Sequence, residues 1–453
     1  MQQRLTLIAI ATIAFLLPSC ATNPATGKTE FNIVSEQEEL AMGKEAHEEI
    51  LGELDVYDEK PELNAMVDRI GQRIAASSPR PHLPWTFTLL DTPMVNAMAL
   101  PGGYVYVTRG ILERMNSEDE LAGVIGHEVA HVAARHSAKS ISNSMLAGIG
   151  FVAAAAIAGE ENTEKYGAIA MIGAGLLFTR YSRSQETQAD LLGTQYMAGA
   201  GYNPHGSENM LLGLQRLEGG SVSGIERYFM DHPDPKKRVE DVRRQITTLE
   251  TADATITDRA VDRAAFVRRL DGVVTGNSTL QTLIRDDVVY NRAHGLIARP
   301  PRGWTATLES GSLFAFVPDD ESEQVIYAQE LKEDDDVDAE LEKMGLEHVD
   351  SENVRARSGE RFTIDEWTND EYVLHVTTHD NLALLHVAAK RNDVLAEVVE
   401  ELRVGEKIDV QPSRLRVRTS KRGDAWNEDL AHLNGYDYPS ELPVGVLVKV
   451  PVP

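Results

Sequence analysis

The spacing of hydrophobic and polar residues predicts a helical amino-terminal half that also contains short strands. Residues 35–51 and 61–77 each carry a helical pattern, the first behind a serine and the second behind a proline. Apolar side chains alternate along 85–89, and a second strand is expected over 104–108. Helices mixed with a few strands in this way are typical of an α+β fold.

A further helix is predicted behind Ser117-Glu118-Asp119-Glu120, a sequence typical of a capping box. Apolar residues recur after it at helical spacing, at Leu121, Val124, Ile125, Val129 and Val132. Another helix is predicted over residues 182–199. Gly199 and Gly201 mark its end. The middle of the chain therefore contains two predicted helices, and both carry polar residues of chemical interest.

Past residue 250 the pattern changes to short runs of β-forming residues. These runs cover residues 325–331, 361–367, 372–378 and 382–388, and a helix is predicted over 393–402. We expect an accessory α+β domain over 251–405. Its closely spaced His375 and His379 would lie about 13 Å apart on a strand, too far to share a metal ion.

The chemistry of the chain is concentrated in His127-Glu128-Val129-Ala130-His131, within the helix that begins after Ser117. Residues four apart lie on the same face of a helix, so the two imidazoles can bind one metal ion. Glu128 lies beside them, where it can act on a water molecule as a general base. Two histidines and a glutamate at this spacing are typical of zinc metalloproteases.

The predicted helix over 182–199 offers a third ligand. Catalytic zinc takes three protein ligands and keeps one open position, and Glu186 would complete a set of two histidines and one glutamate. Asp190, one turn later, could accept the free ring N–H of a ligand histidine and fix its tautomer. The alternative is that both acidic residues belong to a solvated helix face.

Three segments resemble metallopeptidase family forty-eight, the family of the CAAX prenyl protease and HtpX. They are HEVAHVAARHS from His127, SRSQETQAD from Ser182 and DHPDPKKR from Asp231. The segments 23–27 and 34–36 are similar to the start of the periplasmic lipoprotein members. The resemblance implies a mostly helical gluzincin-type domain over 20–250 with a small sheet. It also implies one Zn²⁺ per chain on His127, His131 and Glu186, with Glu128 as the catalytic base.

His232 and Pro233 resemble the loop that precedes the next helix in this family. His232 could approach the open zinc position or stabilise the oxyanion, with Arg238 near it, or it could cap a helix. As a fourth ligand it would displace water and leave the enzyme inhibited until the loop moved. His136 is expected to support the metal site or the fold rather than to bind the metal.

The segment 96–110 is similar to the strand region that precedes the zinc helix in this family. Family members place an exposed edge strand beside the zinc, so a substrate peptide could add to residues 98–103 as an extra strand. The predicted substrate contacts are Ala99, Leu100, Gly102 and Gly103. An ordinary hairpin is the alternative.

Cys20 is the only cysteine, so an intrachain disulfide is excluded. It follows a basic start and an apolar run over 5–17, which together predict a secretory signal peptide over 1–19. Leu17-Pro18-Ser19-Cys20 resembles a bacterial lipobox. This implies lipidation of Cys20 and a location on the periplasmic side of the envelope, with Ala21 favouring the outer membrane. A retained signal-anchor is the alternative, but the run is shorter than the ~20 residues that span a bilayer.

The formal net charge of −27 excludes nucleic acid as a partner, because phosphate binding needs a basic surface. Two apolar runs, over 145–158 and 167–178, are each short for a membrane span, and acidic residues separate them. A helical hairpin that serves as a lid, a dimer surface or a membrane-dipping element is one interpretation, and packed core is the other.

These observations predict a lipid-anchored zinc endopeptidase that hydrolyses misfolded or misassembled envelope proteins. Its partners would be protein or peptide substrates and the membrane. Peptidoglycan is a further candidate because residues 406–453 resemble a degenerate LysM module, although a packing domain is the alternative. A silent wall-binding scaffold or assembly chaperone is a rival function, against which the intact Glu128 argues. A peptidoglycan hydrolase is a second rival.

Overall fold

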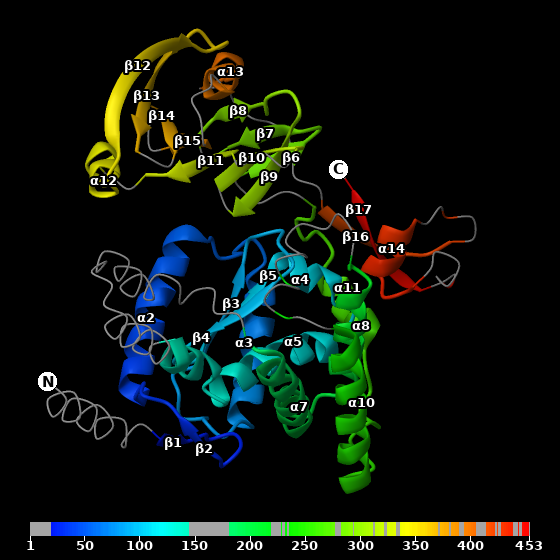
Figure 1. Cartoon of the computed structure of the whole chain (residues 1–453). Helices are drawn as coiled ribbons and strands as arrows, with labels where there is room; N and C mark the ends of the chain where they lie inside the picture. Colours follow the sequence, from blue (N-terminus) through cyan, green and yellow to red (C-terminus); the bar gives the residue numbers. More distant parts are fainter. Residues whose placement is uncertain are drawn as a thin grey trace, which may run out of the picture.

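The computed structural model confirms the α+β class (Figure 1). It describes residues 20–144, 181–218, 228, 232, 235–276, 282–292, 294–310, 313–320, 324–331, 336–369, 372–379, 382–388, 394–404, 414–421, 424, 427–437, 443 and 446–452. The signal peptide predicted over 1–19 and the apolar runs over 145–158 and 167–178 lie outside the described residues. No helix in the described part of the chain is both long and apolar enough to cross a bilayer.

The helical body of the protein contains both zinc-motif helices. Its elements are α2 (Glu36–Glu53), α3 (Pro61–Ala76), β3 (Thr86–Leu90), β4 (Ala97–Leu100), β5 (Tyr104–Thr108), α4 (Arg109–Arg114), α5 (Glu118–Ala133), α7 (Arg183–Gly199), α8 (His205–Gln215), α10 (Pro235–Ala252) and α11 (Arg263–Arg269). The helices expected over 35–51, 61–77 and 182–199 are therefore confirmed. So are the strands expected over 85–89 and 104–108.

A three-stranded sheet lies beside these helices in the order β3-β5-β4. β3 runs parallel to β5 and β4 runs antiparallel to it, with Ala99 opposite Val105. α3 packs against β3, and α5 packs against β4. No other described strand pairs with β4, so β4 forms an edge of the sheet beside the helix that carries the HExxH motif.

α5 and α7 approach each other closely because a glycine lies on each helix at their contact. A Cβ atom on Gly193 would lie 2.6 Å from the carbonyl carbon of Gly126, and one on Gly126 would lie 2.9 Å from the Gly193 oxygen. Any side chain at either position would therefore push the two helices apart. This contact lies directly beside His127, so it sets the distance between the ligands on the two helices.

The end of α5 is held by side chains from the start of the described chain. β1 (Cys20–Thr22) pairs with β2 (Thr29–Phe31). In the turn between them, Asn23 Nδ2 donates to the Ala134 carbonyl at 3.0 Å. The buried Arg80 donates to the Val132 carbonyl at 2.9 Å. Both acceptors lie at the carboxyl end of α5, where donors stabilise the helix terminus.

The carboxyl-terminal tail packs on the same body. β16 (Arg414–Thr419) and β17 (Leu447–Val452) form an antiparallel pair with α14 (Glu428–Leu433) between them in sequence. Lys449 is fully buried, and its Nζ donates to the carbonyls of Glu113 and Met115 at 2.7 and 2.9 Å. The core that surrounds the zinc helices extends to Val274 and includes Leu415 and Leu433. The tail thus belongs to the core of the helical body.

A second, β-rich body follows α11 in sequence. It holds a three-stranded sheet of β6 (Thr282–Arg285), β7 (Val288–Asn291) and β8 (Leu296–Ala298). It also holds an antiparallel sheet in the order β12 (Glu347–Arg355), β13 (Arg361–Thr368), β14 (Val373–His379), β15 (Leu382–Ala388), β11 (Gln324–Glu330), β10 (Leu313–Pro318) and β9 (Trp304–Ser310). Two helices accompany these strands, α12 (Val337–Lys343) and α13 (Val394–Glu401).

The predicted β-runs and the helix over 393–402 are found in this second body. His375 and His379 both lie on β14, as expected for a strand over 372–378. The histidine that stands beside His375 is instead His386 on β15, with ring centroids 5.5 Å apart and ring planes 14° from parallel. The strand β12 was not predicted, because nearly all of its side chains are exposed.

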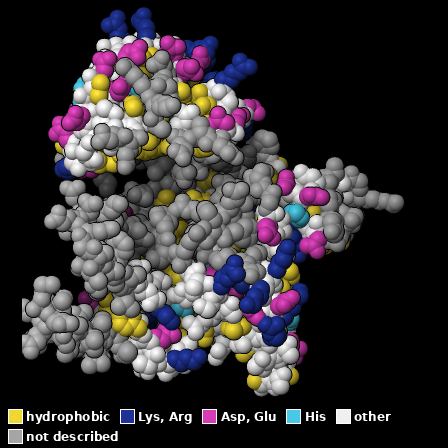
Figure 2. All heavy atoms as spheres, in the orientation of Figure 1, with side chains coloured by type: hydrophobic (Ala, Val, Ile, Leu, Met, Phe, Trp, Pro, Cys, Tyr) yellow, Lys and Arg dark blue, Asp and Glu magenta, His cyan; other side chains and the backbone are white. Residues whose placement is uncertain are grey.

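The negative net charge is unevenly distributed over the surface. Figure 2 shows Lys and Arg side chains gathered where α10 lies in Figure 1. The exposed basic residues of that helix are Lys236, Lys237, Arg243 and Arg244. Two of them pair with carboxylates, Arg243 with Glu208 and Arg244 with Asp241.

We predict that Gly193→Ala destabilises the protein by about 1–3 kcal/mol, because the new methyl group must displace the α5 backbone. Gly213→Ala on α8 is the matched control, since a Cβ atom there has nothing within 4 Å. This control should stabilise the helix by about 0.5–1 kcal/mol. Denaturant unfolding of the two variants measures both effects, and equal stability changes would contradict the proposed close contact.

Candidate metal centre

His127 and His131 are positioned by α5, whose start is well capped. The Ser117 side chain accepts a hydrogen bond from the Glu120 N–H at 3.1 Å, as the capping-box prediction requires. The Glu120 carboxylate differs from that prediction, because it accepts from the Asn116 N–H at 2.7 Å instead of from Ser117. The acidic first turn also favours the helix electrostatically.

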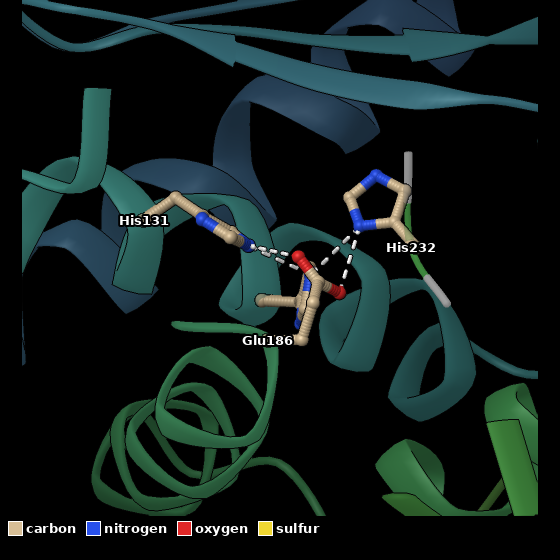
Figure 3. A group of neighbouring side chains, drawn as sticks. His131, Glu186 and His232 are labelled. Carbon is tan, nitrogen blue, oxygen red and sulfur yellow. Dashed lines mark hydrogen bonds and ion pairs between the residues drawn. The ribbon is translucent and has the colours of Figure 1, made fainter. Parts of the chain in front are cut away.

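Glu186 is positioned by α7, which begins with a complete capping box between Ser182 and Gln185. The box fixes the first turn, and Glu186 lies in that turn. Figure 3 shows the Glu186 carboxylate between the rings of His131 and His232, which come from α5 and from the segment before α10. Three separate segments of the chain therefore meet at this point.

The four side chains place their donor atoms at distances that suit a metal ion. One donor atom from each of His127, His131, Glu186 and His232 lies within 4.8 Å of the others, and all four residues are buried. His131 Nε2 lies 3.0 Å from His127 Nε2 and 3.3 Å from Glu186 Oε1. Ligands about 2.0–2.1 Å from a tetrahedral zinc lie about 3.3–3.4 Å apart, so this donor set fits zinc.

The polar atoms at the centre lack the hydrogen bonds that buried groups normally make. Glu186 Oε1 accepts no hydrogen bond from the described residues. The Nε2 atoms of His127 and His131 face each other, so at most one of them can carry a proton between them. Buried polar groups are rarely left in this state, and a cation would satisfy these atoms.

The pKa values at the centre also favour bound positive charge. Burial opposes a charged His127, but Glu186 and Asp190 beside it raise the pKa of this histidine to about 10. Burial likewise opposes an ionised Glu186, yet His232, Arg238 and His127 hold the pKa of this carboxyl well below its usual range. Glu186 is thus an anion that attracts a cation to this pocket.

Asp190 supports His127 from behind. Its Oδ1 lies 2.9 Å from His127 Nδ1, which can donate to it and leave Nε2 directed at the other ligands. Arg238 donates to both Asp190 oxygens, from Nε at 2.7 Å and from Nη2 at 2.9 Å. Arg238 Nη1 also lies 3.1 Å from Glu186 Oε2. This position is compatible with the role that the sequence suggests for Asp190, which is to accept the ring N–H of His127.

His131 is surrounded by His136, which was expected to support the metal site or the fold, and by Tyr181 and Gln188, to which the sequence assigned no role. His136 Nδ1 lies 3.0 Å from His131 Nδ1, and the ring of Tyr181 stacks on His131 with centroids 3.9 Å apart. Gln188 lies behind His136, with Oε1 2.7 Å from its Nε2. The only sequence signal for these contacts was the short separation of His136 from the motif.

Glu128 lies beside the donor cluster without belonging to it. Its side chain is buried, and its Oε2 has no hydrogen-bond partner among the described residues. Burial raises the pKa of this carboxyl, although His127 and His232 oppose the shift. A carboxylate with a raised pKa and a free oxygen is suited to take up a proton.

His232 faces the cluster. Its Nδ1 lies 3.0 Å from Glu186 Oε2 and 3.3 Å from His127 Nε2. The buried Tyr228 stacks on its ring with centroids 4.8 Å apart, and Arg238 donates to its carbonyl at 3.3 Å. Of the three sequence-based roles for His232, this position is compatible with approach to the open metal position.

The predicted substrate segment divides into two parts. Ala99 and Leu100 lie on the edge strand β4, where the Leu100 side chain is buried. Gly102 and Gly103 form the turn to β5 with φ of 84° and 105°, a conformation that favours glycine. A Cβ atom on Gly102 would lie 3.2 Å from the Leu40 Cα, so this turn packs against α2.

Comparison with known proteins identifies relatives of this site. Residues 61–246 match peptidase family M48. The chain is similar to the mitochondrial metalloendopeptidase OMA1 of Schizosaccharomyces pombe, with 32% identity over 48% of this chain and 64% of the relative. It is also similar to the putative beta-barrel assembly-enhancing protease of Vibrio cholerae, with 30% identity over 59% of this chain and 57% of the relative. A third relative, metalloprotease YcaL of Escherichia coli, is 28% identical over 36% of this chain and 63% of the relative.

The chain thus spans less than two thirds of each of these relatives. The matches confirm the family resemblance carried by the sequence motifs. Members of this family are zinc-dependent metalloproteases, so the expectations of a hydrolase domain and of zinc as its metal are also confirmed.

We predict that Asp190→Asn weakens zinc binding about 10–100-fold, because His127 loses the carboxylate that orients it. Asp241→Asn is the matched control: it makes the same charge change on α10, where Asp241 pairs with the exposed Arg244. Chelator competition on the two purified variants measures the affinities. Equal zinc affinity in both variants would remove Asp190 from the metal centre.

Proposed function

We propose that this chain, whose residues 61–246 belong to peptidase family M48, is a zinc-dependent endopeptidase that acts on proteins of the cell envelope. The observation that carries the proposal is the convergence of His127, His131 and Glu186 beside a buried Glu128 whose Oε2 has no hydrogen-bond partner among the described residues. A protein that only bound a partner would have no need of a carboxylate held in this position.

Each group has a definite task in this proposal. His127, His131 and Glu186 would hold the zinc ion. When bound, zinc supplies polarisation of the scissile carbonyl and a lowered pKa for water. Glu128 would take the proton from the attacking water and return it to the leaving amine. Asp190 and Arg238 would keep His127 oriented throughout.

His232 supports a resting state in which the site is closed. Catalytic zinc keeps one position open, whereas four protein ligands are typical of structural zinc. With His232 as a fourth donor, no position would remain for water or substrate. We propose that His232 must withdraw before catalysis, so that the segment before α10 regulates access to the metal.

The edge strand β4 supports binding of extended peptides. The Thr108 N–H donates to the Asn96 carbonyl, so Asn96 directs its backbone toward β5. Alternate residues of an antiparallel strand face opposite edges, so Ala97 and Ala99 direct their backbone groups away from β5. The Ala97 N–H already donates to Asn96 Oδ1 at 2.9 Å, so the groups offered to a substrate are the Ala97 C=O and the N–H and C=O of Ala99. A substrate strand could pair with these groups next to α5.

The substrates we propose are misfolded or misassembled envelope proteins. The relative from Vibrio cholerae is named a beta-barrel assembly-enhancing protease, which supports an envelope setting for this chain too. We further propose that Cys20 is lipidated. Only two residues separate it from Asn23, which contacts the end of α5, so a lipid there would hold the catalytic body close to the membrane surface.

A wall-binding scaffold is the second candidate, favoured by the β16–α14–β17 tail and its similarity to LysM sequences. This tail is buried against the protease core through Lys449, which favours a structural role for it. Co-sedimentation of the full chain with purified cell wall tests the alternative, because a structural tail gives no binding.

We predict that the full chain with bound zinc cleaves casein and that Glu128→Gln with equal zinc does not. His232→Ala should raise the wild-type rate several-fold, because it removes the fourth donor. Peptide release and zinc content are measured on the same samples. Activity that survives Glu128→Gln would remove Glu128 as the base, and a silent His232→Ala with bound zinc would favour the scaffold.

We predict that Ala99→Pro lowers kcat/KM on the order of ten-fold, because a substrate strand loses one backbone hydrogen bond. Its zinc content and melting temperature should stay unchanged. Met98→Pro is the matched control: Met98 faces β5, so proline there breaks the sheet and lowers the melting temperature. Unchanged kcat/KM in Ala99→Pro would rule out strand addition at β4.

A further inference from the structure

The Nδ1 atom of His131 contacts a different kind of group from the one that the Nδ1 atom of His127 contacts. Behind His127 lies a carboxylate, Asp190, which Arg238 neutralises. Behind His131 lie the neutral ring of His136 and then the side-chain amide of Gln188. A carboxylate accepts hydrogen bonds only, so it fixes the tautomer of His127 by itself. An imidazole can donate or accept, so His136 cannot fix the tautomer of His131 alone.

The geometry allows only two proton arrangements for this chain of contacts. The Nδ1 atoms of His131 and His136 lie 3.0 Å apart, a distance at which one proton and not two fits between them. If the proton belongs to His131, its Nε2 is free for the metal. If it belongs to His136, the neutral His131 carries its proton on Nε2, where it would block metal binding.

Gln188 distinguishes the two arrangements. Its Oε1 lies 2.7 Å from His136 Nε2, and a carbonyl oxygen can only accept. His136 Nε2–H must therefore donate to Gln188, which leaves the His136 Nδ1 lone pair to accept from His131 Nδ1–H. The His131 Nε2 lone pair then points at Glu186 and His127.

We propose that His136 and Gln188 are positioning residues that hold His131 in its metal-binding tautomer. This inference rests on the proposed zinc centre. Gln188 lies two residues after Glu186 on α7, so the helix that supplies one ligand also sets the protonation of another on α5. We call the contacts that run from Gln188 through His136 to His131 the relay. Gln185, on the same helix, donates to the His136 carbonyl at 3.2 Å and holds the backbone of His136 in place.

Gln188 presents an amide to His136 where a carboxylate could also accept the hydrogen bond, and electrostatics favours the amide. The charges of a zinc ion and Arg238 cancel those of Glu128, Glu186 and Asp190 when all three carboxylates are ionised. A further carboxylate behind His131 would leave net negative charge in a buried site, which is costly. The relay through His136 fixes a tautomer without adding charge.

The test compares zinc affinity in two pairs of variants, measured on the full chain by chelator competition. His136→Leu removes the acceptor and should weaken zinc binding about 10–100-fold. His136→Asn places an amide oxygen near the former Nδ1 and should restore most of the affinity. Gln188→Met should weaken binding several-fold, whereas Gln195→Met, at an exposed position on the same helix, should leave zinc affinity unchanged.

Thermal unfolding of the metal-free variants and the visible spectrum of the Co²⁺-substituted forms separate folding from coordination. A Co²⁺ spectrum altered in His136→Leu and restored in His136→Asn supports the relay. Equal affinity loss in His136→Leu and His136→Asn, or in Gln188→Met and Gln195→Met, would overturn it. Zinc binding by a His232→Ala variant that cleaves no protein would refute the proposed function while leaving this inference intact.

Discussion

The close contact between α5 and α7 is the constraint on which the rest of the site depends. The ligands come from different helices, and their donor atoms must meet within a few ångströms. Gly126 and Gly193 make this possible because neither helix carries a side chain at the crossing. The same crossing brings Asp190 to His127 and Gln188 to His136. One backbone approach thus sets both the ligand geometry and the outer contacts of the two ligand histidines.

The charges of the side chains in this buried pocket determine which ions it can bind. Burial penalises every charge in it, yet Glu186 and Asp190 stay ionised because Arg238 and the histidines lie beside them. Arg238 balances one of these two carboxylates, so the other is balanced either by a proton on His127 or by a bound metal ion. Glu128 is the exception, since burial raises its pKa and no donor in the described part of the chain reaches its Oε2. Of the three carboxylates in the pocket, the one assigned as the base is therefore the one whose pKa the fold raises.

Sequence alone was sufficient where local rules apply. The capping-box sequence at Ser117 and the helical spacing behind it located the first zinc helix, and Gly199 and Gly201 marked the end of the second. Runs of β-forming residues located β11, β13, β14 and β15. β12 was missed because an exposed edge strand needs no apolar alternation. The roles of Gln188, Tyr181 and Lys449 were missed as well. Their contacts join segments far apart in sequence, and no spacing rule predicts which distant carbonyl a lysine will reach.

Both ends of the described chain converge on α5, and this gives the helix its support. Asn23 and Arg80 donate to carbonyls at its end, and Lys449 donates to carbonyls just before its start. A helix that bears two metal ligands must not tilt, because a shift of one donor by an ångström breaks the coordination geometry. Holding α5 at both termini restricts such tilting, and the segments that do so lie far outside the motif. The carboxyl-terminal tail therefore supports the metal centre by holding α5 in position, as the amino-terminal segment does at the other end of this helix.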